Sequence, residues 1–182
     1  MITEDKRTER FFRGLLVALG FEKRGFRFLT APSGVGAGEA WVREQYPTEV
    51  RYLRSRSYQA LCVVAVRDGD NVGVSKRKAE LDHALTNAGL AVRQPKEAIA
   101  TPVPTWSIEN WLLDLLGHEG VDEGQCPSDA PKTPWKRVFE RDHAADERSA
   151  LRGAVGAWVS PRSAPPELPS LTDGRSEMDR IG

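Results

Sequence analysis

The apolar residues of the first 115 positions fall into alternating blocks with helix-like and strand-like spacing. The first block has helical spacing, which is carried by Phe12, Leu15, Leu16 and Leu19. Gly20 follows these residues and predicts that the helix ends there. The same spacing predicts helices over residues 39–56, 74–88 and 106–113. Pro47 lies inside the first of these three helices and is expected to kink or split it.

Predicted strands lie between these helices. Residues 60–66 are continuously apolar and rich in β-branched side chains, as expected of a strand that is covered on both faces. Residues 25–31 and 98–103 predict two further strands, and residues 1–4 form a stub of another. Strands that alternate with helices indicate an α/β fold with a mostly parallel sheet. Ligands of such sheets bind at the edge where the strands have their carboxyl ends.

The pattern changes after residue 116. Residues 117–134 resemble a loop, residues 135–158 predict one helix, and the Pro-rich segment 161–169 precedes a short polar end. We therefore expect an α/β domain over residues 1–116. Residues 117–182 are expected to form a loop, a helical extension and a tail that pack on that domain.

The numbers of charged residues, cysteines and histidines limit which kinds of partner and metal site this chain can have. The 182 residues include 26 basic and 26 acidic side chains, so a partner such as DNA or RNA would be held by local patches or bridging cations. Cys62 and Cys126 are too few for a disulfide framework, and the three histidines are too scattered for a zinc site. The charged start and the absence of a long apolar run predict a cytoplasmic protein that does not enter a membrane.

Acidic residues follow three of the predicted strands. They are Glu4, Asp5, Glu9, Asp68, Asp70 and Glu109. Carboxylates gathered at one sheet edge repel one another, and a divalent cation such as Mg²⁺ relieves that repulsion. Gly69 lets the backbone between the two aspartates fold closely, so both can face one ion. Each acid alone also has a simpler interpretation, because Asp and Gly are common in turns and acids are favoured in the first turn of a helix.

Three of these segments resemble a known family. Residues 3–9, the strand that ends in Asp68-Gly69-Asp70, and residues 106–111 look like those of small bacterial Toprim-like proteins. The resemblance spans about residues 2–113, and the segment 169–171 also looks like a recurrent feature of these relatives. The Toprim fold is shared by primases, topoisomerases and overcoming-lysogenisation-defect nucleases. Its motif is a glutamate after the first strand and an Asp-x-Asp after a later strand, which together bind Mg²⁺.

The resemblance implies a role for each matching residue. Glu4 matches the first glutamate, and Asp68 and Asp70 match the Asp-x-Asp, so these three are expected to be metal ligands with a catalytic role. Glu9 resembles the second acid of the nuclease-type motif, although its spacing is one residue longer than usual. It is expected to bind a second ion or to act as a general base.

Three accessory residues depart from or extend the family pattern. Asp5 stands where many Toprim domains have glycine, and Glu109 matches a glutamate that recurs in this subgroup. Arg67 stands where an apolar residue is usual. It is expected either to pair with a carboxylate or to contact a phosphate.

Two segments are candidates for phosphate contacts. Lys76, Arg77 and Lys78 follow the acidic turn and can steer a phosphate backbone toward it, although such runs are usually solvated helix faces. Gly34 and Gly36 belong to a Gly-x-Gly-x-Gly run before a helix that can present amides to a phosphate. A flexible loop is the commoner reading of such a run.

The resemblance implies an Mg²⁺- or Mn²⁺-dependent nuclease that hydrolyses phosphodiester bonds of DNA or RNA by a two-metal mechanism. It also implies a separately encoded ATPase as a partner and a role in phage defence. The alternative is a non-catalytic Toprim-like subunit that regulates or docks to an ATPase. Neutral net charge, the displaced Glu9 and the presence of Arg67 favour this alternative.

Overall fold

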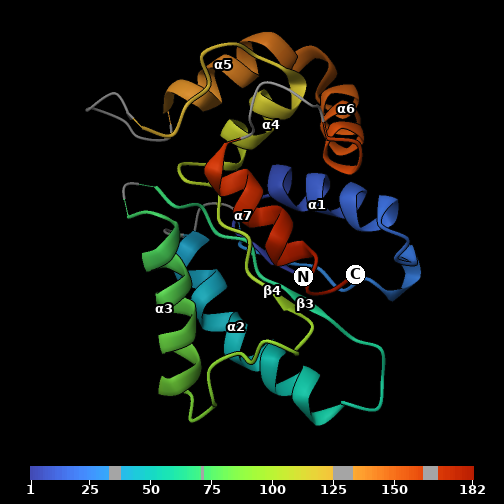
Figure 1. Cartoon of the computed structure of the whole chain (residues 1–182), viewed down its shortest axis with the longest axis vertical. Helices are drawn as coiled ribbons and strands as arrows, with labels where there is room; N and C mark the ends of the chain where they lie inside the picture. Colours follow the sequence, from blue (N-terminus) through green and yellow to red (C-terminus); the bar gives the residue numbers. More distant parts are fainter. Residues whose placement is uncertain (33–37, 71, 125–132, 162–167) are drawn as a thin grey trace.

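A computed structural model describes residues 1–32, 38–70, 72–124, 133–161 and 168–182 (Figure 1). Within these residues the sheet consists of short parallel strands. They are β1 (Ile2–Thr3), β2 (Leu29–Thr30), β3 (Val63–Val64) and β4 (Ile99–Ala100). The chain is therefore α/β, as predicted, with far more helix than strand.

The strand order places β1 beside β3. β1 pairs with β2, and β3 pairs with β4, both in parallel. A parallel bridge between Ile2 and Ala65 joins the two pairs, and the backbone N–H of Val66 donates to the carbonyl of Ile2 at 2.9 Å. The resulting order is β2, β1, β3, β4, so the direction of winding reverses between β1 and β3. In open α/β sheets this reversal is where ligands bind.

Helices cover both faces of the sheet. They are α1 (Lys6–Ala18), α2 (Gly38–Ser55), α3 (Val74–Asn87), α4 (Ile108–Leu116), α5 (Thr133–His143), α6 (Glu147–Val159) and α7 (Pro169–Met178). Two short 3₁₀ turns occupy Lys23–Gly25 and Ala144–Asp146. None of the helices in the described ranges is long and apolar enough to cross a membrane.

Alternate residues of β3 and of the two positions after it belong to different apolar cores. Val63 and Ala65 are buried in a core with α2 and α3, whereas Val64 and Val66 are buried in a core with α1, α4, α6 and α7. This alternation follows from the two-residue period of a strand. Figure 1 shows α2 and α3 to the left of and below the strands and α1 and α7 above them. The fold therefore has a helical layer on each side of the sheet.

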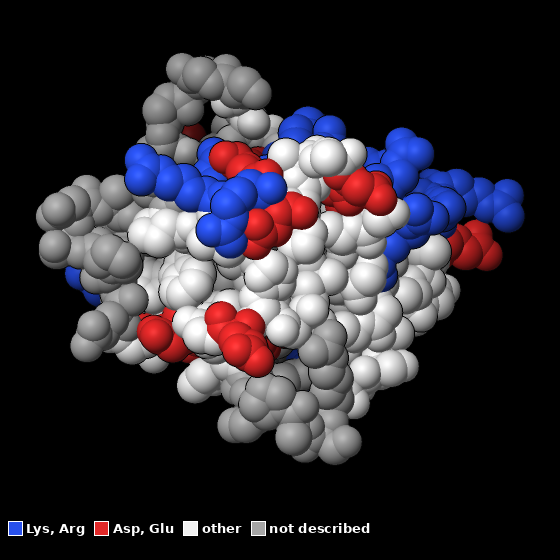
Figure 2. Space-filling model, turned by 90° about the horizontal axis from the view of Figure 1, so that it is seen from above, with Lys and Arg blue, Asp and Glu red and all other residues white. Residues whose placement is uncertain are grey.

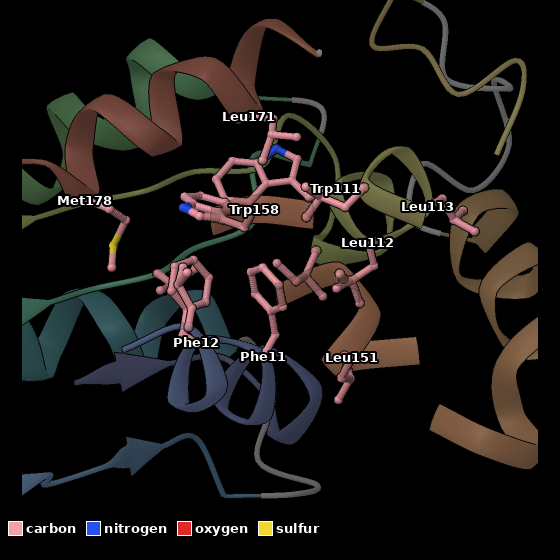
Figure 3. Close-up of a cluster of buried hydrophobic side chains, with 14 of the residues drawn as sticks. Phe11, Phe12, Trp111, Leu112, Leu113, Leu151, Trp158, Leu171 and Met178 are labelled. Carbon is pink, nitrogen blue, oxygen red and sulfur yellow. The ribbon is translucent and has the colours of Figure 1, made fainter. Parts of the chain in front are cut away.

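An aromatic cluster joins the C-terminal helices to α1 (Figure 3). Trp158 of α6 lies 5.9 Å from Phe11 and 5.7 Å from Trp111 of α4, measured between ring centroids. Gly174 of α7 packs against Trp111 so closely that an added Cβ would lie 2.3 Å from the indole ring. The helices α4, α6 and α7 thus bury their apolar faces against the same side of the molecule as α1.

The helices differ from the prediction in three places. Pro47 does not split α2, since Val42, Tyr46 and Val50 anchor the helix to the sheet on both sides of the proline. The predicted single helix over 135–158 is divided into α5 and α6, because Asp146 caps a new helix by accepting from the N–H of Ser149 at 3.2 Å. The segment after the Pro-rich stretch, predicted as a polar end, contains α7.

The strands are shorter than predicted. The predicted strand over 98–103 narrows to β4, because Pro102 and Pro104 have no N–H to continue the ladder. The predicted strand over 25–31 begins with a 3₁₀ turn and keeps only β2. The apolar run 60–66 pairs regularly only over β3, with Ala65 as a bridge.

Candidate functional site

An open cavity lies at the carboxyl ends of β1 and β3. Its volume is about 450 Å³, and its lining includes Glu4, Asp68 and Glu109. Side chains from α1, α5 and α6 also line the cavity and include both bases and acids. The cavity thus occupies the point at which the strand order reverses.

Glu4 and Asp68 lie next to each other in this cavity. The Oε1 atom of Glu4 accepts a hydrogen bond of 3.1 Å from the backbone N–H of Asp68, across 64 residues of sequence. Gly38, the first residue of α2, approaches Glu4 so closely that an added Cβ would lie 3.0 Å from the carbonyl oxygen of Glu4. The pairing of β1 with β3 and the start of α2 therefore fix the position of Glu4.

The turn after β3 is held by the segment that follows β4. The N–H of Gly69 donates to the carbonyl of Pro104 at 2.7 Å, and the N–H of Asp70 donates to the carbonyl of Trp106 at 3.1 Å. A Cβ at residue 69 would lie 2.3 Å from the carbonyl oxygen of Thr105. Only glycine fits at this position. Asp70 adopts a left-handed conformation with φ 50°.

Asp70 contacts α3. Its Oδ2 atom accepts a hydrogen bond of 2.9 Å from Arg77, whose side chain is only 6% exposed. Arg77 also donates to Glu80 at 3.0 Å, and the fully buried Arg67 donates to the same carboxylate at 2.9 Å. Burial alone raises the pKa of Glu80, but the two guanidinium groups outweigh burial and lower that pKa. Of the expectations for Arg67, pairing with a carboxylate is thus observed, and the carboxylate is that of Glu80.

Glu9 lies on α1 near the end of β2. It accepts hydrogen bonds from Lys6 at 2.6 Å, from the hydroxyl of Thr30 at 2.6 Å and from Arg13 at 2.8 Å. Burial alone raises the pKa of the Glu9 carboxyl, but these donors lower it to about 2. The described lining of the cavity contains Glu4 but not Glu9.

Asp5 caps α1. Its Oδ1 atom accepts from the N–H groups of Arg7 and Thr8 at 2.7 and 2.9 Å, and its Oδ2 atom accepts from the Thr8 hydroxyl at 2.8 Å. Both carboxylate oxygens therefore serve the first turn of the helix, as an aspartate N-cap does. Asp5 lines the cavity but has this structural role as well.

Glu109 forms an ion pair with Arg7 at the cavity wall. Arg7 also lies 3.4 Å from Glu147 and 3.5 Å from Glu140, and its guanidinium stacks on the ring of Phe139. Burial alone lowers the pKa of Arg7, but Glu109 and Glu147 outweigh it and raise that pKa. The sequence analysis did not identify Arg7, Glu140 or Glu147. No local pattern indicates that residues more than 100 positions apart meet here.

The residues predicted to contact phosphate have different surroundings. Lys76 is exposed, Arg77 is buried beside Asp70, and Lys78 bonds to Asp173 and Glu177 of α7 at 2.8 and 2.9 Å. Gly34 and Gly36 lie outside the described residues. Of the predicted basic run, only Lys76 projects into solvent.

Acidic groups at this edge of the sheet thus have different surroundings. Within the described ranges there is no group of three or more His, Cys, Asp or Glu residues arranged to hold a metal ion. Glu4 and Asp68 both line one open cavity, where the backbone N–H of Asp68 donates to Glu4. One or two carboxylates suffice for Mg²⁺, which completes its coordination with water and substrate phosphate.

Comparisons with models of known protein families, with curated proteins and with solved structures found no match for this chain.

Proposed function

We propose that this chain is a Toprim-like nuclease that binds Mg²⁺ or Mn²⁺ through Glu4 and Asp68 and hydrolyses phosphodiester bonds of DNA or RNA. The observation that carries the proposal is the 3.1 Å hydrogen bond from the N–H of Asp68 to Glu4, where β1 adjoins β3. It brings two carboxylates from distant parts of the chain to one open cavity.

The two carboxylates would hold one ion. Their oxygens are the hard ligands that Mg²⁺ prefers, and the open cavity leaves room for water and a phosphate. When bound, the ion activates water and stabilises negative charge on phosphate oxygens. A second ion would need Glu9, whose carboxylate is already held by Lys6, Arg13 and Thr30. The proposal is therefore a single protein-held ion rather than the two expected from the resemblance.

Cations of the cavity wall would bind the phosphate. Lys6, Arg10 and Lys136 line the same cavity as Glu4 and Asp68. Arg7 is held at the wall by Glu109, so its position is fixed before any substrate arrives. These side chains can hold a phosphodiester beside the two carboxylates by charge-assisted hydrogen bonds.

A hydrolysis assay tests this proposal. Purified protein is incubated with single-stranded oligonucleotides and with plasmid DNA, in Mg²⁺ or Mn²⁺ and in EDTA. Glu4→Gln and Asp68→Asn are expected to lower the cleavage rate at least about 100-fold, as loss of a metal or charge-stabilising ligand does. Glu44→Gln, on the exposed side of α2, is the matched control and should cleave at the native rate. Cleavage that persists in EDTA or in both cavity variants would refute the proposal.

The second candidate function is a non-catalytic Toprim-like subunit that docks to a separately encoded ATPase. The observation that favours it is the ion pair between Asp70 and the buried Arg77, which engages the second aspartate of the Asp-x-Asp turn. No cleavage by the native chain, with or without the ATPase, together with a stable complex between the two, would favour this candidate. Either candidate is proposed to act in the cytoplasm, in defence against phage.

A further inference from the structure

A second cavity lies between α1 and α6 and adjoins the first. Its volume is about 510 Å³, and its lining includes Arg10 of α1 and Arg148 and Arg152 of α6. Arg10 and Glu147 line both cavities, so the two lie next to each other at these residues. We call this second cavity the α1–α6 groove.

The close approach of α1 to α6 shapes the floor of the groove. A Cβ added to Gly14 would lie 3.2 Å from Cγ2 of Val155, so the two helices approach closely at this glycine. Leu151 and Val155 line the groove beside this contact. The floor is thus small and apolar, and the long arginine side chains form the walls.

The charge of the groove favours an anion. Among the described lining residues, three arginines are accompanied by one acid, Glu147, which lies 3.0 Å from Arg10. Arg148 and Arg152 are exposed, and the side chain of Arg10 is 62% exposed. Arg148 and Arg152 are four residues apart on α6, so they project from the same face of that helix. Guanidinium groups are well suited to phosphate because they can donate two parallel hydrogen bonds.

Basic and acidic side chains are mixed over part of the surface. Figure 2, which looks from the α5 side, shows the two kinds next to one another toward the left of the view and a mainly basic group toward the right. The chain as a whole has equal numbers of basic and acidic residues. A polyanion would therefore be drawn to a local row of cations rather than to a broad basic surface.

We propose that the α1–α6 groove binds the phosphate backbone of a single nucleic-acid strand and leads that strand to the cavity of Glu4 and Asp68. The end point of this path rests on the proposed function, whereas binding in the groove does not. A single strand can bend to follow a positively charged groove between two helices. A duplex is a stiff rod with its phosphates on the outside, and it cannot follow the same path without being deformed.

Oligonucleotide binding without hydrolysis tests this proposal. The probe is a fluorescein-labelled single-stranded DNA of about 20 nucleotides, titrated with the full chain in EDTA and followed by fluorescence anisotropy. The test variant is Arg148→Gln combined with Arg152→Gln, both on the exposed side of α6. The matched control is Arg24→Gln combined with Arg43→Gln, which removes the same charge from exposed positions outside the groove.

The test variant is expected to weaken binding about 10-fold near 0.1 M salt. It should also reduce the slope of log K against log salt by about 1.4, which corresponds to two lost phosphate contacts on a single strand. The control variant should bind within about twofold of the native chain, since it loses only long-range charge that salt screens. Native-like folding of both variants is checked by circular dichroism and thermal unfolding.

Several results would overturn the proposal. They are equal binding by test and control variants, tighter binding of the matching duplex than of the single strand, or no binding by the native chain. The failure of the proposed function is distinguishable. If the native chain binds the strand more tightly than the arginine variant but cleaves nothing in Mg²⁺ or Mn²⁺, the binding proposal is supported and the proposed hydrolysis is refuted. If the native chain cleaves the strand and the arginine variant has an unchanged KM, binding in the groove is refuted and the proposed hydrolysis is supported.

Discussion

Arg77 donates a hydrogen bond of 2.9 Å to Asp70, while Asp68, two residues earlier in the same turn, lines the cavity beside Glu4. The two aspartates of one turn therefore have different surroundings. Asp68 lines the cavity, where the proposed function gives it the role of a metal ligand. Asp70, with its left-handed backbone and its buried guanidinium partner, ties the turn to α3. The Asp-x-Asp pattern alone does not distinguish these two roles.

Removing the guanidinium of Arg77 should destabilise the fold. Arg77→Met leaves the carboxylates of Asp70 and Glu80 without this partner in a largely buried place, which costs about 3 kcal/mol for a broken buried pair. For a chain of this size that corresponds to a fall in Tm of roughly 6–12 °C. Lys76→Met, at the exposed neighbouring position, should change the free energy of unfolding by less than about 0.5 kcal/mol. Urea and thermal unfolding measure both, and equal stability of the two variants would contradict the assignment.

Glu9 should make stability depend on pH in the acid range. The folded state holds its pKa at about 2, against an ordinary value of 4.5, so its contribution is complete above pH 5 and is lost as pH falls from 4.5 toward 2. Glu9→Gln is expected to lower the free energy of unfolding at pH 7 by roughly 2–3 kcal/mol. The difference from the native chain should fall to roughly a quarter of its pH 7 value by pH 2.5, because the folded-state carboxyl is still largely ionised there. Urea unfolding across this range is the measurement, with Glu44→Gln as control, and a constant difference at all pH values would refute the role of charge.

Glycine at position 69 should be essential, and glycine at position 156 should not. Gly69→Ala places a methyl group 2.3 Å from the backbone carbonyl of Thr105, so the turn must shift, at a cost of about 2 kcal/mol or more. Gly156 lies within α6, and no atom lies within 4 Å of an added Cβ. Gly156→Ala should therefore stabilise the chain by roughly 0.5–1 kcal/mol through helix propensity. Thermal unfolding of the two variants should move Tm in opposite directions, and a shift in the same direction would contradict this packing.

Glu177 should anchor α7 to the edge of the sheet. Its Oε2 atom accepts from the backbone N–H of Thr101, just after the edge strand β4, and its carboxylate pairs with Arg93 and Lys78. Burial alone raises the pKa of this carboxyl, but the three donors lower it to about 2. Glu177→Ala leaves two cations and a buried N–H without this acceptor, so a loss of about 3–5 kcal/mol is expected.

Glu177→Gln separates the hydrogen bond from the charge. Its amide oxygen can still accept from Thr101, so we expect a smaller loss than in the alanine variant. Because α7 covers the edge of the sheet, the alanine variant should also aggregate more readily on partial unfolding. Urea unfolding and light scattering measure these effects. An alanine variant as stable as the glutamine variant would show that Glu177 does not anchor the helix.

The proximity of Glu4 to Asp68 could be predicted because it follows from topology. Parallel strands present their carboxyl ends at one edge, and each residue lies just beyond a strand. The two apolar faces of residues 63–66 could be predicted as well, since the run is apolar at every position. These inferences need only the order of the elements and not the details of side-chain packing.

The partners of the other acids could not be predicted in the same way. Arg7 meets Glu109 and Glu147 only because α1, α4 and α6 converge, which no local pattern encodes. Glu9 is different, since Lys6 and Arg13 stand three positions before it and four after it on one helix. That spacing predicts ion pairs between Glu9 and both basic residues on the surface of the helix. The helix α7 was missed because its first turn follows a Pro-rich stretch and few of its residues are apolar.

Calorimetric titration of Mn²⁺ into the metal-free chain tests the central claim most directly, because it measures the ion at its ligands without any substrate. The account predicts one bound ion per chain, and a loss of affinity of at least about 10-fold in Glu4→Gln and in Asp68→Asn, since each removes a charged ligand. Glu9→Gln should bind Mn²⁺ as the native chain does. Native affinity in the Glu4 and Asp68 variants, or loss of affinity only in the Glu9 variant, would contradict the account.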